Sequence, residues 1–117
     1  MEKDDAIQAL SALAHPGRLD VFRLLVRAGP EGVAAGEIAR LTGSPASSLS
    51  TNLAILSAAG LTASRRDGRS ILYRAAFERM TGLLAFLMED CCAGKPEVCA
   101  PLAAVARQAC GAEGPTC

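Results

Sequence analysis

The segment from Ser44 to Arg74 limits the fold of this chain more than any other part of the sequence. Its first half carries leucines at helical spacing, namely Leu49, Leu53 and Leu56. Its second half, residues 62–66 and 69–74, predicts two short strands joined by a tight turn at Asp67-Gly68. We therefore expect a helix that leads directly into a basic hairpin.

The predicted helix has clear ends and two different faces. Ser44 is the expected N-cap, Pro45 the first helical residue, and Gly60 the first residue past the end. The leucine stripe faces the core, so the opposite face points away from it. That opposite face is made of small residues: Ser47, Ser50, Thr51 and Ala54.

Four further segments have apolar residues at helical spacing. They predict helices from Ile7 to Ala14, from Pro16 to the Gly29-Pro30 stop signal, from Gly36 to Leu41, and from Phe77 to Asp90. Residues 31–35 and 91–101 are expected to be irregular, and residues 102–109 to form a short last helix. The predicted fold class is thus mainly α with a small β-hairpin, in the order α-α-α-α-β-β-α.

A chain of 117 residues is long enough for one modest hydrophobic core. We expect residues 1–90 to form that domain and residues 91–117 to form a C-terminal segment. The acidic start of the chain and the lack of a long apolar run argue against a signal peptide and a membrane span. A cytoplasmic protein without a membrane partner is expected.

Two helices, a tight turn at Thr42-Gly43-Ser44 and a basic hairpin have the order of a winged helix-turn-helix, in which the second helix enters the major groove of DNA. The chain has no net charge, yet residues 40–74 hold five basic residues and one acidic residue, a local net charge of +4. An ordinary solvated helix and hairpin would also carry such residues. The expected contacts to double-stranded operator DNA are Ser44, Ser47, Ser48, Ser50, Thr51, Arg65, Arg66 and Arg69.

A homodimer is expected for two reasons. One helix-turn-helix per chain reads only half of a two-fold site. The helix predicted at 77–90 is also more apolar than a core of this size requires. The expected interface consists of Ile7, Leu10, Phe77, Met80, Leu84 and Leu87.

The cysteines form the second chemical feature of the sequence. Four of the five lie between Asp90 and Gly111, and the fifth is the last residue. In a reducing compartment an odd number of cysteines indicates thiols or ligands of a soft metal rather than disulfides. Cys91, Cys92 and Cys99 are the expected site. Three thiolates suit trivalent arsenic or antimony, whose lone pair occupies the fourth direction.

Other chemistries remain open for these thiols. Zinc or cadmium would need a fourth ligand, which Cys110 or Cys117 could supply. Oxidation of the thiols would make the protein a redox sensor. An enzyme is not expected, because the chain has no Cys-x-x-Cys motif and its one histidine, His15, is better suited to an exposed or capping position. No organic cofactor is expected.

Several motifs resemble, in order, those of the ArsR family of metalloregulatory repressors. The run Ala12–Leu19 resembles the entry to that family's second helix, and residues 36–39, 47–56 and 59–61 resemble its next two helices. Residues 65–69 and Tyr73 resemble its wing. The resemblance covers about residues 7–101 and implies a dimeric DNA-binding repressor.

The resemblance also bears on the inducer and the operator. The chain has Val33-Ala34-Ala35 where well-known arsenic sensors carry a Cys-x-Cys, and Thr51-Asn52 where many members carry an Arg-His pair. It is similar instead to the arsenic-responsive branch with adjacent cysteines after the dimer helix, here Cys91-Cys92. This similarity implies As(III) or Sb(III), or a trivalent organoarsenical, as inducer. The operator preference of the family does not carry over.

Overall fold

The computed structural model describes residues 1–89, 100–101, 104–105 and 108. The chain divides into two compact units, Met1–Phe86 and Leu87–Cys117. In the second unit the described residues 100–101, 104–105 and 108 are helical. Residues 100–101 were expected to be irregular, so helical structure begins earlier in this segment than predicted.

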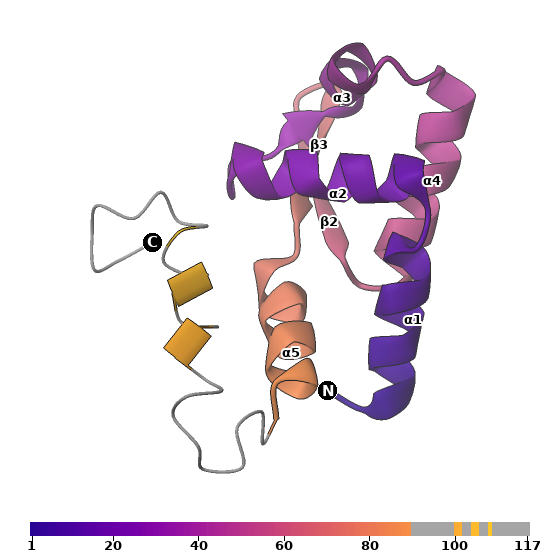
Figure 1. The fold of residues 1–117 in the computed structure, drawn as a ribbon. Helices are drawn as coiled ribbons and strands as arrows, with labels where there is room; N and C mark the ends of the chain where they lie inside the picture. Colours follow the sequence, from indigo (N-terminus) through magenta and orange to yellow (C-terminus); the bar gives the residue numbers. More distant parts are fainter. Residues whose placement is uncertain (90–99, 102–103, 106–107, 109–117) are drawn as a thin grey trace. The chain divides into compact units, whose positions relative to one another are not determined.

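The first unit contains the elements of a winged helix-turn-helix (Figure 1). In chain order these are α1 (Lys3–Leu13), α2 (Pro16–Ala28), β1 (Val33–Ala34), α3 (Ala35–Thr42), α4 (Ala46–Ala58), β2 (Thr62–Asp67), β3 (Ser70–Ala75) and α5 (Phe77–Leu87). The predicted fold class is confirmed, with one additional strand. Helix α3 lies at one end of the unit, and α1 and α5 lie toward the other.

The additional strand is β1, in a stretch that was expected to be a loop. It lies at the edge of an antiparallel sheet of order β1-β3-β2 and pairs Val33 with Tyr73 and Ala34 with Leu72. A strand of two residues has no alternation of its own to detect. Its pairing depends on a partner far along the chain, which explains why the prediction was wrong.

The hairpin turn lies one residue later than predicted. Strand β2 continues to Asp67, which pairs with Ser70, so the two connecting residues are Gly68 and Arg69. Gly68 has φ of 63°, a left-handed conformation that glycine adopts without strain. The glycine therefore occupies the first connecting position, and Arg69 stands at the tip of the wing.

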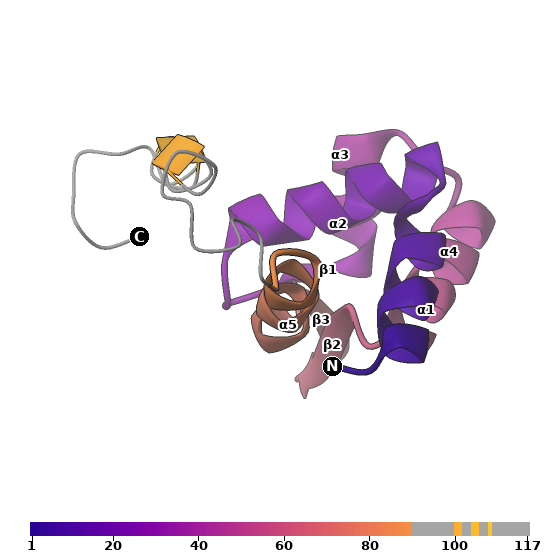
Figure 2. The same ribbon diagram turned by 60° about the horizontal axis from the view of Figure 1, so that its bottom comes forward.

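The core is made mainly of aliphatic side chains, with contributions from every helix of this unit and with Phe22 as an aromatic member; Leu25, Ile38, Leu56 and Leu61 are fully buried. Helix α1 contributes alanines rather than its larger residues: Ala6, Ala9 and Ala12 are buried. These small side chains let α1 lie close alongside α4 (Figures 1 and 2). In α2, Val21, Phe22 and Leu25 are buried, whereas Leu19 is 41% exposed.

Several predicted helix ends differ from the structure, and the largest difference is in α1, which begins at Lys3 rather than at Ile7. Helix α4 begins at Ala46 with Pro45 as its N-cap, because the first helical bond joins the Leu49 N–H to the Pro45 carbonyl at 3.0 Å. Ser44 is therefore outside the helix. Helix α5 ends at Leu87, three residues before the predicted end, and a turn follows at residues 88–89.

His15 caps helix α2, as expected for a capping rather than a catalytic residue. Its Nδ1 accepts hydrogen bonds from the backbone N–H of Gly17 at 3.1 Å and of Arg18 at 3.4 Å. These N–H groups belong to the first turn of the helix, where no backbone acceptor is available. The imidazole ring therefore stabilises the start of α2.

This cap leads to a prediction about stability. Replacing His15 by Ala should lower the free energy of unfolding by about 1 kcal/mol, because both acceptor contacts are lost. His15→Asp should retain the stability, since a carboxylate is a good N-cap acceptor at the positive end of a helix. Urea denaturation followed by circular dichroism measures both values. Equal stabilities for the Ala and Asp variants would contradict the capping role.

Candidate nucleic-acid interface

The turn between α3 and α4 is held by side-chain hydrogen bonds. Thr42 Oγ1 donates to the Ile38 carbonyl at 2.8 Å and lies 3.1 Å from Ser44 Oγ. Gly43 ends α3 with φ of 70°, in the left-handed region. Ser44, an expected DNA contact, is half-buried in this turn and its hydroxyl is paired with Thr42. It helps to orient α4.

The outer face of α4 is exposed and carries mostly small side chains, although Ile55 of the same helix is also 37% exposed. Leu49, Leu53 and Leu56 are buried on the inner face, as predicted. The four expected contacts within the helix, Ser47, Ser48, Ser50 and Thr51, are all exposed. Thr51 Oγ1 donates to the Ser47 carbonyl at 3.2 Å. Small hydroxyl side chains allow the helix to approach the edges of bases and phosphates closely.

The wing separates its arginines onto different faces. Neighbouring residues of a strand point to opposite sides, and cross-strand partners share a side. Arg66 pairs with Ile71 on the face that also carries Tyr73, and Tyr73 lines a notch of about 160 Å³ together with α3 and α4. Arg65 lies on the other face, where its Nη2 donates to the Glu31 carbonyl at 2.9 Å.

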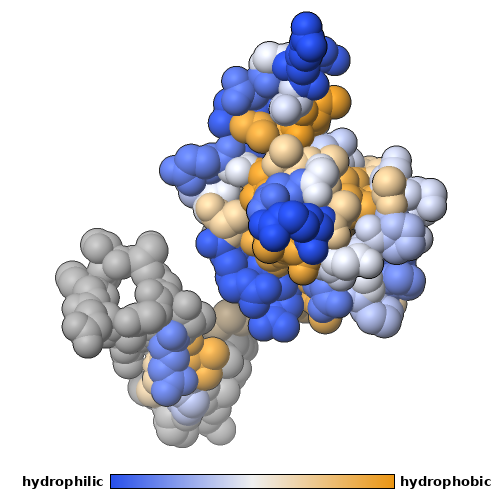
Figure 3. Space-filling model, turned by 90° about the horizontal axis from the view of Figure 1, so that it is seen from above, coloured by the Kyte–Doolittle hydropathy of each residue, from blue (hydrophilic) through white to orange (hydrophobic). Residues whose placement is uncertain are grey.

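The hairpin forms a strongly hydrophilic projection in the view from the α3 end (Figure 3). Arg65, Arg66 and Arg69 are all exposed there. Of the three, Arg66 lies on the face of the helix-turn-helix, and Arg69 occupies the turn. The sequence suggested three equivalent arginines, whereas the structure distinguishes them.

The two faces predict unequal roles for neighbouring arginines. Arg66→Ala should weaken operator binding by about tenfold and lower the slope of log affinity against log salt concentration, because the expected phosphate contact of Arg66 would be lost. Arg65→Ala should change affinity less, since Arg65 is bonded to the loop after α2. Fluorescence anisotropy at several salt concentrations compares the two variants. A larger loss for Arg65→Ala would contradict this assignment.

The basic character of residues 40–74 is smaller than the sequence indicates, because two of its arginines are paired. Arg40 Nε donates to Glu37 Oε2 at 2.9 Å, and this hydrogen bond holds the pKa of Glu37 below its ordinary value. Arg74 Nη1 lies 3.9 Å from Glu78 Oε2. Both carboxylates lie just outside residues 40–74. Glu37 and Arg40 are three residues apart on α3, a spacing that brings side chains together on a helix, whereas Arg74 belongs to β3 and Glu78 to the first turn of α5.

The apolar residues expected at a dimer interface are largely exposed in the chain described here. Ile7 is 54% exposed, Leu10 42%, Leu84 50% and Leu87 53%. Phe77 and Met80 are half-buried and pack against the core. Helix α5 also approaches the other elements less closely than the other helices do.

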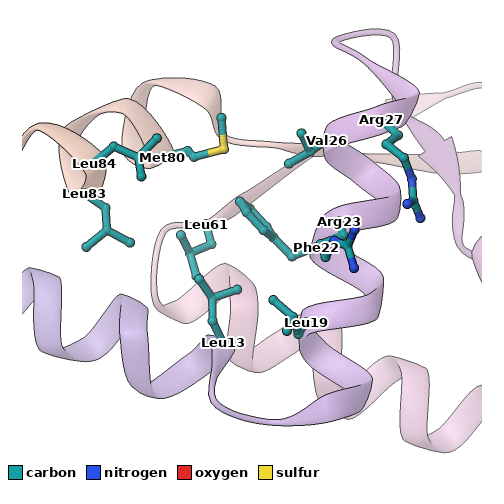
Figure 4. Close-up of a pocket in the computed structure, with 10 residues that line it drawn as sticks. All are labelled: Leu13, Leu19, Phe22, Arg23, Val26, Arg27, Leu61, Met80, Leu83 and Leu84. Atoms are coloured by element: carbon teal, nitrogen blue, oxygen red, sulfur yellow. The ribbon is translucent and has the colours of Figure 1, made fainter. Parts of the chain in front are cut away.

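A cavity of about 340 Å³ lies between α2 and α5 (Figure 4). Phe22, Val26 and Met80 are among the apolar side chains that point into it, while the guanidinium groups of Arg23 and Arg27 turn away. Helix α5 is thus incompletely packed against its own unit. Such packing is consistent with a helix that needs a further apolar partner.

The expected thiolate site at Cys91, Cys92 and Cys99 lies outside the described residues, as do Cys110 and Cys117. Among the residues that are described, no group of three or more His, Cys, Asp and Glu side chains is placed to hold a metal ion. None of the helices in the described part of the chain is long and apolar enough to cross a membrane.

The fold and this interface define a winged helix-turn-helix DNA-binding protein. A helix-turn-helix domain family matches residues 13–65. The HTH-type transcriptional regulator YgaV of Escherichia coli (strain K12) is 37% identical over 89 residues, which are 76% of this chain and 88% of YgaV. Together with the ArsR-family structures described next, this similarity shows that the chain belongs to the ArsR family of HTH-type transcriptional regulators.

Solved structures agree with this assignment. The homodimeric winged helix-turn-helix domain Mb0332 of Mycobacterium bovis, described as a possible ArsR-family regulator, is 32% identical with a TM-score of 0.60 over 74% of this chain and 81% of that one. A possible transcriptional regulator for arsenical resistance is 29% identical with a TM-score of 0.59, over 68% and 79%. The family consists of transcriptional regulators, which confirms the expectation that the chain is not an enzyme.

Proposed function

We propose that this DNA-binding regulator is a homodimeric repressor that trivalent arsenic releases from its operator. One observation carries the first part of the proposal. The small-residue face of α4 is exposed, and Arg66 lies on the sheet face whose Tyr73 contacts the notch between α3 and α4. The exposed apolar residues of α1 and α5 lie toward the other end of the unit. A molecule with these two surfaces can join a second copy and still present α4 to DNA.

In the proposed complex, α4 enters the major groove, and Arg66 and Arg69 contact phosphates beside it. Each protomer reads one half-site. Two half-sites whose centres are about 10–10.5 base pairs apart, or a multiple of that, lie on one face of the duplex. We therefore expect an operator with two-fold symmetry. The homodimer reported for Mb0332 supports this arrangement.

The proposed inducer site consists of Cys91, Cys92 and Cys99. Soft thiolates favour a thiophilic centre over Mg²⁺, Ca²⁺ or Mn²⁺. Three of them match the pyramidal coordination of As(III) or Sb(III), or of a trivalent organoarsenical. Similarity to a possible regulator for arsenical resistance adds support. Zinc, cadmium and oxidants are the competing inducers.

The site would act on DNA binding through the dimer helix, because Cys91 and Cys92 follow α5 closely in the sequence. An inducer that favours a different arrangement of the dimer helices changes the distance between the two α4 helices. Coupling of this kind is typically about 1–3 kcal/mol. By reciprocity, operator DNA should weaken arsenite binding by the same factor.

The experiment begins with selection of an operator from random duplex DNA. Arsenite is then titrated, under reducing conditions, into the complex of the full chain with a fluorescent operator. We expect arsenite to release the wild type, whereas the single variants Cys91→Ser, Cys92→Ser and Cys99→Ser should stay bound. Cys117→Ser is the matched control and should respond like the wild type.

The competing inducers give different outcomes. Release by zinc or cadmium, with loss of the response in Cys110→Ser or Cys117→Ser, would replace arsenic by a four-ligand metal site. Release by peroxide without arsenite would indicate a redox sensor. In either case the DNA-binding part of the proposal would stand and the arsenic part would be wrong.

A further inference from the structure

The C-terminal end of helix α4 is held by polar side chains from α1 and α5. Gln8 of α1 donates a hydrogen bond from Nε2 to the Ala58 carbonyl at 3.3 Å. The last carbonyls of a helix have no partner within the helix, so a side chain can bind them. Gln8 is exposed, and its contact joins α1 to the helix proposed to read DNA.

Arg79 of α5 reaches the same end of α4. Gly60, just past the helix, has φ of 77°, and a Cβ atom at this position would lie 3.0 Å from Arg79 Nε. The Arg79 side chain therefore lies against the backbone of Gly60. Its Nη2 is 3.6 Å from Asp5 Oδ1 of α1. A positive charge at this position interacts favourably with the negative end of the α4 dipole.

Stability alone does not explain an arginine at this position. Within the described residues, Arg79 Nε is buried and has no hydrogen-bond partner, which is unfavourable. An apolar side chain of similar length could pack on Gly60 without burying an unpaired N–H group. The guanidinium group, however, is the part that joins Gly60 of the α4 end to Asp5 of α1. Its contribution is thus to connect three segments.

We propose that Gln8, Asp5 and Arg79 form a clasp that fixes α4 relative to the helices of the dimer and so determines which half-site spacing the protein accepts. This inference rests on the proposed homodimer. If α1 and α5 meet their copies across the two-fold axis, the clasp sets the distance and angle between the two α4 helices. One additional base pair moves a half-site by about 3.4 Å and rotates it by about 34°. A rigid clasp discriminates against that change.

The test measures the affinity of the full-length protein for the selected operator and for versions with one base pair added or removed between the half-sites. The variants are Gln8→Ala, Gln8→Glu, which keeps the size but removes the donor, and Arg79→Met, which keeps the apolar stem. Ser11→Ala is the matched control, since Ser11 is exposed on α1 and makes no side-chain hydrogen bond within the described residues.

We expect wild type and Ser11→Ala to lose at least about tenfold in affinity when the spacing changes by one base pair. The clasp variants should lose no more than about threefold, with unchanged dimer mass and melting temperature. The ratio of the affinities for the two spacings stays the same when a variant loses affinity for both operators equally. Exposed Gln8 can also be changed without disturbing the core. If Arg79→Met lowers the melting temperature, the two Gln8 variants decide the result.

Two outcomes would overturn the inference in different ways. A wild type that prefers one spacing, together with clasp variants that lose as much as the wild type, would overturn the clasp and leave the dimer intact. A wild type that is monomeric or indifferent to spacing would overturn the proposed homodimer and the clasp with it.

Discussion

Replacing Leu84 by Glu is expected to convert the proposed homodimer into monomers and to weaken operator binding by about 10²–10⁴-fold, because joined half-sites bind with a high effective concentration. Leu84 is 50% exposed in the single chain, so the substitution disturbs the core little. At a two-fold interface it would bring two carboxylates into an apolar surface, which is strongly unfavourable. Ile7→Glu on α1, where Ile7 is 54% exposed, should have the same effect.

Sedimentation equilibrium measures the mass of the variants, and anisotropy measures their affinity for the selected operator. Leu41→Glu is the control, because Leu41 is 53% exposed but lies on α3, outside the proposed interface. It should remain dimeric. Dimers of Leu84→Glu and Ile7→Glu with wild-type mass would show that the apolar residues of α1 and α5 serve another purpose.

Replacing Ser47 by Glu is expected to reduce operator affinity by at least about 100-fold, since a like charge placed against DNA costs several kcal/mol. Ser47 is exposed on the outer face of α4 and is the second residue of the helix. A carboxylate is favourable in the first turn of a helix, so the fold should be as stable as in the wild type. The loss would then report on DNA contact alone.

Ser11→Glu provides the control for net charge, because it adds the same negative charge on the exposed surface of α1. It should bind the operator with nearly wild-type affinity. Thermal melting of both variants checks the fold. If Ser47→Glu and Ser11→Glu lose affinity equally, overall charge rather than insertion of α4 would account for the effect.

The parts of the fold that the sequence predicts well depend on local patterns. Each of these patterns determines the structure of residues close to it in the sequence. Examples are the leucine stripe of α4, the stop at Gly29-Pro30 and the glycine of the wing. His15 could also be expected to cap α2 because Pro16 follows it. These elements appear in the structure within one or two residues of their predicted positions.

The features that the sequence did not predict depend on partners elsewhere in the fold. Strand β1 exists because β3 lies beside it. The different roles of Arg65 and Arg66 follow from the register of the hairpin, and a shift of one residue would exchange their faces. In α1, periodicity alone selected Ile7 and Leu10, but the close approach of α4 leaves room only for alanines on the inner face.

The ion pairs of the arginines in residues 40–74 affect how strongly the protein binds DNA that is not its target. Within the described residues, carboxylates offset the charges of Arg40 and Arg74, so Arg65, Arg66 and Arg69 are the arginines of residues 40–74 whose charge is left to displace counterions from DNA. Binding to arbitrary sequence derives almost entirely from such counterion release. A regulator with few displaced ions and no net charge is held only weakly by DNA that is not its target. We therefore expect DNA that is not the target to retain few copies of the protein.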